Sequence, residues 1–194
     1  PKYKPKKPYQ QIIELNNPKL YAFQDDYNVF IKGGGNFNQH IFTSIPTFYE
    51  TQVAKMQGIT NMINKNKLVV GDMSGPRPYR ILDIGGTEGA WAKALAKNNP
   101  LVDIQVLDPN LKAKLAFESG DIVTNAQFLH AAFTHVVKDQ GKPFVEGGIK
   151  QPVFFQGFKK PYADIVHESM AFQFMSNERA EQIKYIKENV LNTN

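Results

Sequence analysis

The sequence of 194 residues contains no cysteine, which excludes disulfide bonds, thiolate metal sites and catalysis by a cysteine nucleophile. It also lacks any apolar run approaching the roughly 20 residues of a membrane-spanning helix, and it shows no secretory signal peptide. Hydrophobic residues make up 42% and charged residues 21%, a composition typical of one globular domain with its own core. We therefore expect a cytoplasmic protein without membrane segments.

Acidic residues are absent from the first seven positions, which carry four lysines. These lysines account for most of the formal net charge of +5. We expect residues 1–20 to form a solvated, extended Pro/Lys-rich arm, with contact to RNA, DNA or an acidic partner as the alternative.

Residues 21–78 are predicted to form a helical cover over the main domain. Thr47 and Glu50 have the spacing of a capping box at the start of a helix, directly after Pro46. Met56, Ile59 and Ile63 then recur at helical spacing, which indicates one buried face.

The stretch from 80 to 95 combines a short apolar strand (80–84), a glycine-rich turn (85–89) and a helix that starts near Glu88. Glycines at such a turn let the backbone approach a ligand closely, and the helix N-terminus offers free N–H groups. Asp83, at the end of the strand, can accept a hydrogen bond from an ammonium or a hydroxyl group. A plain strand–turn–helix corner is the alternative interpretation.

A second strand, residues 103–108, ends in Asp108, about 20 residues after the glycine turn. A doubly wound fold places the carboxylate that holds a ribose at this distance. In the helix after this strand we expect Leu111 and Leu115 to point inward. In the last helix, residues 177–190, we expect the same of Ile183, Ile186 and Val190.

At this point the chain resembles the class I S-adenosylmethionine-dependent methyltransferases. Their first motif, Asp-x-Gly-x-Gly-x-Gly, is similar to Asp83-Ile-Gly85-Gly86-Thr87-Glu88-Gly89, with Thr87 at the middle glycine. Residues 163–175 resemble their fourth strand and the turn after it. The resemblance implies a Rossmann-like, doubly wound and mostly parallel α/β sheet that binds S-adenosylmethionine through Asp83, Gly85, Gly86, Thr87, Gly89 and Asp108.

His167 and Glu168 end the fourth predicted strand and are the candidate catalytic residues. Ligands of open α/β sheets bind beyond the carboxyl ends of the strands, where either side chain can act as a general base or orient the acceptor. His167 can equally fill space beneath the cofactor. The other histidines show no spacing that predicts a metal site.

The stretch after the third predicted strand (126–132) departs from the family. Many relatives carry an acid there for the adenine amino group, whereas this chain has Ala131, Ala132 and Phe133. An insert over about 134–162, with a hairpin, then interleaves lysines with aromatic residues. These residues either anchor the insert to the domain or bind single-stranded nucleic acid by stacking and phosphate contacts.

Seven strands are usual in the family, and this sequence has room for about four. We expect a chain truncated after the fourth strand, either a piece of a longer polypeptide or a reduced fold. An uncovered edge strand would favour association with another chain or with the missing C-terminal part.

The leading functional hypothesis is a methyltransferase, as a domain or a fragment, with an unidentified acceptor. One alternative is a catalytically inactive, methyltransferase-like structural or interaction module of a larger assembly. Another is an RNA ribose 2′-O-methyltransferase, because Trp91 follows the first motif as it does in those enzymes; their Lys-Asp-Lys-Glu set would place Glu168 at the Asp position. A cytosine C5-methyltransferase is excluded, since it needs a cysteine nucleophile.

Overall fold

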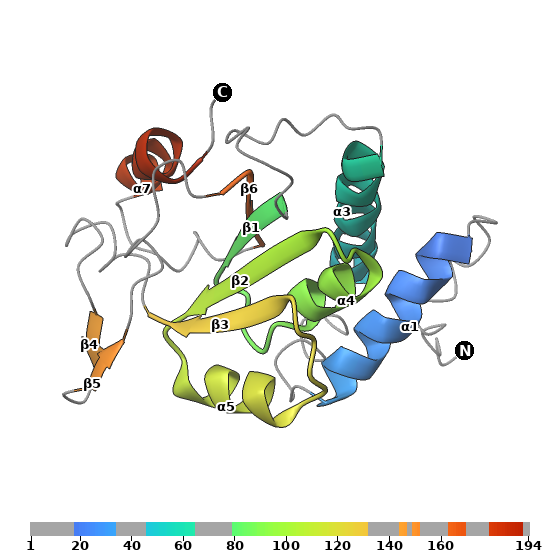
Figure 1. Cartoon of the computed structure of the whole chain (residues 1–194), viewed down its shortest axis with the longest axis horizontal. Helices are drawn as coiled ribbons and strands as arrows, with labels where there is room; N and C mark the ends of the chain where they lie inside the picture. Colours follow the sequence, from blue (N-terminus) through green and yellow to red (C-terminus); the bar gives the residue numbers. More distant parts are fainter. Residues whose placement is uncertain are drawn as a thin grey trace, which may run out of the picture.

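The computed structural model describes residues 18–33, 46–64, 79–131, 144–146, 149–151, 163–169 and 179–191. Its centre is a four-stranded sheet with the order β3-β2-β1-β6, in which every neighbouring pair is parallel (Figure 1). The strands are β1 (Tyr79–Ile84), β2 (Val102–Asp108), β3 (Ala126–His130) and β6 (Ile165–Glu168). The parallel α/β sheet predicted from the sequence is confirmed.

The strand order reverses between β1 and β6. The chain runs outward from β1 to β2 and β3, then returns to the other side of β1 for β6. The register places Asp83 beside His167, and Asp108 beside His130. Since ligands of open α/β folds bind at such a reversal, the carboxyl ends of β1, β2 and β6 are the place to look for a site.

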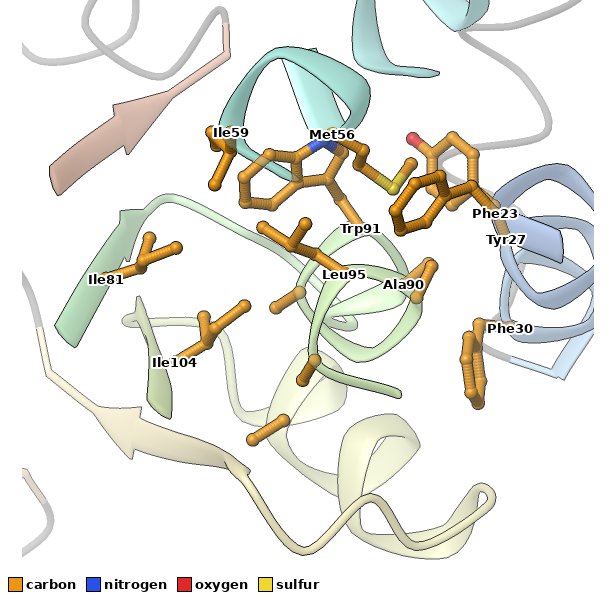
Figure 2. Close-up of a cluster of buried hydrophobic side chains, with 14 of the residues drawn as sticks. Phe23, Tyr27, Phe30, Met56, Ile59, Ile81, Ala90, Trp91, Leu95 and Ile104 are labelled. Atoms are coloured by element: carbon orange, nitrogen blue, oxygen red, sulfur yellow. The ribbon is translucent and has the colours of Figure 1, made fainter. Parts of the chain in front are cut away.

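Helix α4 (Ala90–Asn98) packs on one face of the sheet, and α1 (Pro18–Gly33) and α3 (Pro46–Asn64) join the same buried cluster, with α1 packed against the other two helices. Figure 2 shows Trp91 of α4 beside Ile59 and Met56 of α3, with Phe23 of α1 on the other side of Met56. Ile81 and Ile104 contribute to the same buried cluster from the sheet. This packing fixes α3 against α4, and so beside the carboxyl end of β1.

The apolar spacing of α1 and α3 accounts for their helical form. In α1 the buried aromatic residues Phe23, Tyr27 and Phe30 follow the i, i+4, i+7 pattern of one helix face. In α3 the predicted inward residues Met56, Ile59 and Ile63 are all buried. The helix begins at Pro46, a residue suited to a first turn, so Thr47 lies inside the helix rather than at its N-cap.

The opposite face of the sheet is covered by α7 (Arg179–Tyr185) and the π-helix η3 (Ile186–Val190). Ile186 and Val190 are buried there, as predicted, in a cluster that includes Leu82 and Ile84 of β1. The Ala163 N–H donates to the carbonyl of Val190 at 2.8 Å, and Ala163 forms an isolated parallel bridge with Leu191. The chain after η3 thus returns to the β6 side of the sheet.

Three predicted inward residues point outward instead: Leu111, Leu115 and Ile183 are 52%, 54% and 54% exposed. In α5 (Leu111–Ser119) the inward stripe contains Ala113 and Phe117, and a shift of two residues turns a side chain by about 200°. The buried residues Gln182 of α7 and Ile186 of η3 lie four apart, which leaves Ile183 beside the inward stripe.

Within the predicted insert, β4 (Phe144–Glu146) and β5 (Ile149–Gln151) form an antiparallel pair. The other residues of the insert lie outside the described ranges, as do residues 1–17 of the predicted arm, so nucleic-acid binding by either stays a prediction. Helix α1 begins inside the range expected for the arm. No helix in the described part of the chain combines the length and apolarity needed to cross a bilayer.

Candidate functional site

In the glycine turn between β1 and α4, every second residue has a left-handed backbone conformation. Gly85, Thr87 and Gly89 have φ angles of 67°, 50° and 74°. Glycine adopts these angles freely, whereas a β-branched residue such as Thr87 is strained there. Thr87 therefore occupies a position that suits the glycine of the motif, and its N–H group donates to Asp108 Oδ2 at 3.1 Å.

Gly86 lies directly over Asp83. A Cβ atom at Gly86 would overlap Asp83 Oδ2 and would lie 2.8 Å from Val106 Cγ1. At Gly89 a Cβ atom would lie 2.5 Å from the ring of Phe117. These close approaches explain why the turn is built from glycines: its backbone is packed onto the ends of β1 and β2.

Asp108 ends β2 and is 6% exposed. Its two carboxylate oxygens accept from the N–H groups of Thr87 and Asn110, at 3.1 and 2.8 Å. Burial raises the pKa of this carboxyl above its usual value of 3.8, and the two hydrogen bonds oppose that rise. A carboxylate has about four acceptor positions, so this one can still accept from a vicinal diol.

Asp83 and His167 form a buried pair across β1 and β6. Asp83 Oδ1 lies 2.8 Å from His167 Nδ1, and the two residues are 2% and 8% exposed. The imidazole also stacks on Trp91, with 3.7 Å between ring centroids and 5° between ring planes. A carboxylate accepts the hydrogen of Nδ1, and this assignment leaves Nε2 as the acceptor in the neutral ring.

Helix α3 adds a lysine that the sequence reasoning missed. Lys55 Nζ donates to Ser169 Oγ at 2.9 Å and to the carbonyl of Glu168 at 3.3 Å, and it lies 3.5 Å from His167 Nε2. Burial lowers the pKa of Lys55 below its usual value, while the carboxylates of Glu168 and Asp83 oppose that change. The lysine bridges α3 to the carboxyl end of β6.

Gln52, one helical turn before Lys55, completes this cluster. Its Nε2 donates to Ser169 Oγ at 2.6 Å, and its backbone carbonyl accepts from Trp91 Nε1 at 3.1 Å. A sequence signal for both residues exists: Gln52 and Lys55 are polar residues in or beside the apolar stripe of Tyr49, Val53 and Met56. Polar residues near a buried helix face need polar partners, and here these are the Ser169 hydroxyl and the Glu168 carbonyl at the end of β6.

The side chains of the two predicted catalytic residues, His167 and Glu168, lie on opposite faces of the sheet. Glu168 pairs with Ile84 in the register, so alternation turns its side chain to the sheet face opposite Asp83 and His167. The backbone carbonyl of Glu168 accepts from Lys55, and its carboxylate opposes the lowering of the pKa of that lysine by burial. The catalytic roles of His167 and Glu168 remain predictions.

At the end of β3, Ala131 is buried, while Ala132 and Phe133 lie outside the described residues. His130, next to Asp108 in the register, places its Nε2 2.9 Å from the carbonyl of Pro109. Over the described ranges, no group of three or more His, Cys, Asp or Glu residues could hold a metal ion.

No protein-family model and no curated protein matches the sequence. Solved structures do. The plantazolicin methyltransferase BpumL in complex with SAH is 16% identical, with a TM-score of 0.52 over 95% of this chain and 58% of that one. Its complex with a pentazolic desmethylPZN analog and SAH is 17% identical, with a TM-score of 0.52 over 95% of this chain and 58% of that one. The chain thus spans little more than half of these structures and shares their Rossmann-like fold.

Proposed function

We propose that this chain binds S-adenosylmethionine and takes part in transferring its methyl group to an acceptor. The observation that carries the proposal is the contact of the glycine turn after β1 with the end of β2, where the Thr87 N–H donates to Asp108. This contact lies next to the reversal of the strand order between β1 and β6. The SAH complexes of the structures with the same fold support it.

The described residues fit this cofactor. Asp108 would accept from the ribose hydroxyls, and the turn Gly85–Gly89 would lie against the amino-acid end, with Asp83 beneath it. The position of Gly86 over Asp83 leaves no room for a side chain, so the backbone itself would face the ligand. Because β1 separates β2 from β6, a cofactor with its ribose at β2 would extend toward β6.

When bound, the cofactor supplies an electrophilic methyl group on a sulfonium. The protein then has to align the acceptor and receive its proton where one is lost. We propose His167 Nε2 as the proton acceptor, since Asp83 holds the hydrogen of Nδ1 and would stabilise an imidazolium. Glu168 fits this role less well because its side chain belongs to the other face of the sheet, and this also weakens the RNA 2′-O-methyltransferase alternative.

Calorimetric titration of the chain with S-adenosylmethionine and with S-adenosylhomocysteine tests the proposal directly. Micromolar binding of both is expected. No binding by the folded chain would favour the alternative of an inactive structural module, to which the strained Thr87 and the buried Ala131 also point.

Replacing Asp108 with asparagine is expected to weaken the binding of S-adenosylhomocysteine at least tenfold. The variant loses hydrogen bonds from the ribose to a charged group, which contribute about 1.5–3 kcal/mol. Asp103→Asn is the matched control, because Asp103 is half-buried in the same strand near its other end. Equal affinities of the two variants, both folded by circular dichroism, would refute the ribose assignment.

The affinity for S-adenosylhomocysteine is also expected to fall on acidification. Ribose hydroxyls donate to the charged form of Asp108, so binding weakens by up to about tenfold per pH unit below the raised pKa of that carboxyl. The same raised pKa means that the folded chain binds this proton more tightly than the unfolded chain. Stability from Asp108 is therefore greatest below pH 3.8 and is lost as the pH rises through the raised pKa. Titrations at several pH values, repeated with Asp108→Asn, separate this group from others.

A further inference from the structure

The cluster of Gln52, Lys55, His167 and Ser169 contains a buried acceptor atom, Gln52 Oε1, without a hydrogen-bond partner among the described residues. Gln52 is 2% exposed, its Nε2 is bonded to Ser169 and its backbone carbonyl to Trp91. Its side-chain oxygen, Oε1, is buried and meets no donor in the described part of the chain. An unsatisfied buried acceptor destabilises the folded chain, so a ligand that donates to it would recover this cost.

The hydrogen bonds around Ser169 define what the cluster still needs. Ser169 Oγ accepts from Gln52 and from Lys55, so its own hydrogen is free to face His167 Nε2 at 3.4 Å. Lys55 Nζ donates two of its hydrogens, one to Ser169 Oγ and one to the carbonyl of Glu168. In this cluster, Gln52 Oε1 is the buried acceptor that lacks a donor among the described residues.

The cluster lies where the reacting end of the cofactor would be. Ser169 directly follows β6, the strand toward which a cofactor anchored at Asp108 would extend. The imidazole of His167 is 8% exposed and has Trp91 against its face. Lys55 and Ser169, both half-buried, stand at the Nε2 edge of that ring.

We propose that Gln52, Lys55 and Ser169 form the docking site of the methyl acceptor, and that the acceptor reacts through a hydroxyl oxygen or an amine nitrogen whose hydrogen is donated to Gln52 Oε1. This inference rests on the proposed function. In the reaction the carbon–sulfur bond breaks with its electron pair left on sulfur, and the new bond forms from the acceptor oxygen or nitrogen to the methyl carbon. An amine keeps one hydrogen on Gln52 Oε1 and loses another as a proton to His167 Nε2. A hydroxyl has a single hydrogen, which leaves Gln52 Oε1 and ends as a proton on His167 Nε2 when the new bond forms. A carboxylate or a thioether has no hydrogen to donate and would direct lone pairs at Gln52 Oε1.

Sinefungin, a cofactor analogue with an ammonium-bearing carbon in place of the methylated sulfur, is a probe that needs no identified acceptor. Its N–H groups point from the methyl position into the proposed docking site. We expect the 194-residue chain to bind sinefungin at least tenfold more tightly than S-adenosylhomocysteine. Gln52→Leu should remove this preference while changing the affinity for S-adenosylhomocysteine less than twofold. Gln52→Glu should strengthen it, because a carboxylate attracts the ammonium.

Gln57→Leu is the matched control. Gln57 belongs to the same helix and also has a buried, unpartnered Oε1, but its Nε2 is bonded to Asn61 rather than to Ser169. A preference for sinefungin that survives Gln52→Leu, or that Gln57→Leu also removes, would overturn the docking site and leave the cofactor site standing. Failure of the unsubstituted chain to bind S-adenosylhomocysteine would refute the proposed function itself, and the inference with it.

Discussion

Replacing Gly86 with alanine is expected to lower the free energy of unfolding by about 2–3 kcal/mol and to abolish cofactor binding. The added methyl group would overlap Asp83 Oδ2 and press on Val106. Asp83 cannot move aside, because His167 holds its other oxygen and Trp91 stacks on that imidazole. The backbone of the turn would have to lift off the strand ends, which would displace the groups that face the ligand.

Urea denaturation followed at equilibrium measures the first effect, and titration with S-adenosylhomocysteine measures the second. Gly58→Ala serves as the control, since Gly58 is exposed in the middle of α3 and an added Cβ meets nothing within 4 Å. That control should gain about 0.5–1 kcal/mol from helix propensity. A Gly86→Ala variant as stable as the unsubstituted chain would show that the turn is not packed onto Asp83.

Removing the Asp83 side chain, as Asp83→Ala, is expected to cost about 3 kcal/mol of stability. The substitution leaves the Nδ1 hydrogen of a buried imidazole without its acceptor, and breaking a buried pair that includes a charged group is strongly destabilising. His167→Phe should lower the free energy of unfolding by a similar amount. The substitution keeps the stacking on Trp91 but leaves the buried Asp83 carboxylate without its hydrogen-bond partner.

The double variant Asp83→Ala/His167→Phe isolates the pair. Its loss of stability should fall short of the sum of the single losses by about 1.5–3 kcal/mol, since no buried partner is left unpaired. The measurement is again equilibrium denaturation of all four proteins. Strictly additive losses would mean that the contact between the two side chains contributes nothing.

The positions of the glycine turn and of Asp108 in the candidate site could be predicted from the sequence because their signals are local. An apolar strand, a run of glycines and an acid about 20 residues later specify β1, the turn and Asp108 without knowledge of the rest of the chain. The positive φ angle of Thr87 agrees with the glycine that the motif has there. The mostly parallel sheet followed from the resemblance that this pattern carries, whereas the strand order comes from the structure.

The cluster of Gln52, Lys55 and Ser169 could not be predicted, because it joins residues more than 110 positions apart. The pattern of α3 indicates an amphipathic helix, but only the packing of Trp91 between α3 and the sheet sets which polar residues face β6. The misplaced leucines of α5 have a related cause. A leucine pair at i, i+4 favours one helix face, yet the helix docks through the smaller Ala113 and through Phe117, and periodicity alone cannot rank the two stripes.

Trp91 is the only tryptophan of the chain. Its indole N–H bonds to the backbone of α3, and its ring lies flat on the imidazole of His167. The intrinsic tryptophan fluorescence of this protein therefore originates entirely at the junction of the proposed base and the proposed docking helix. A movement of the His167 imidazole or of α3 changes the surroundings of this fluorophore. Because the sequence contains no second tryptophan, the fluorescence change reports on this site alone.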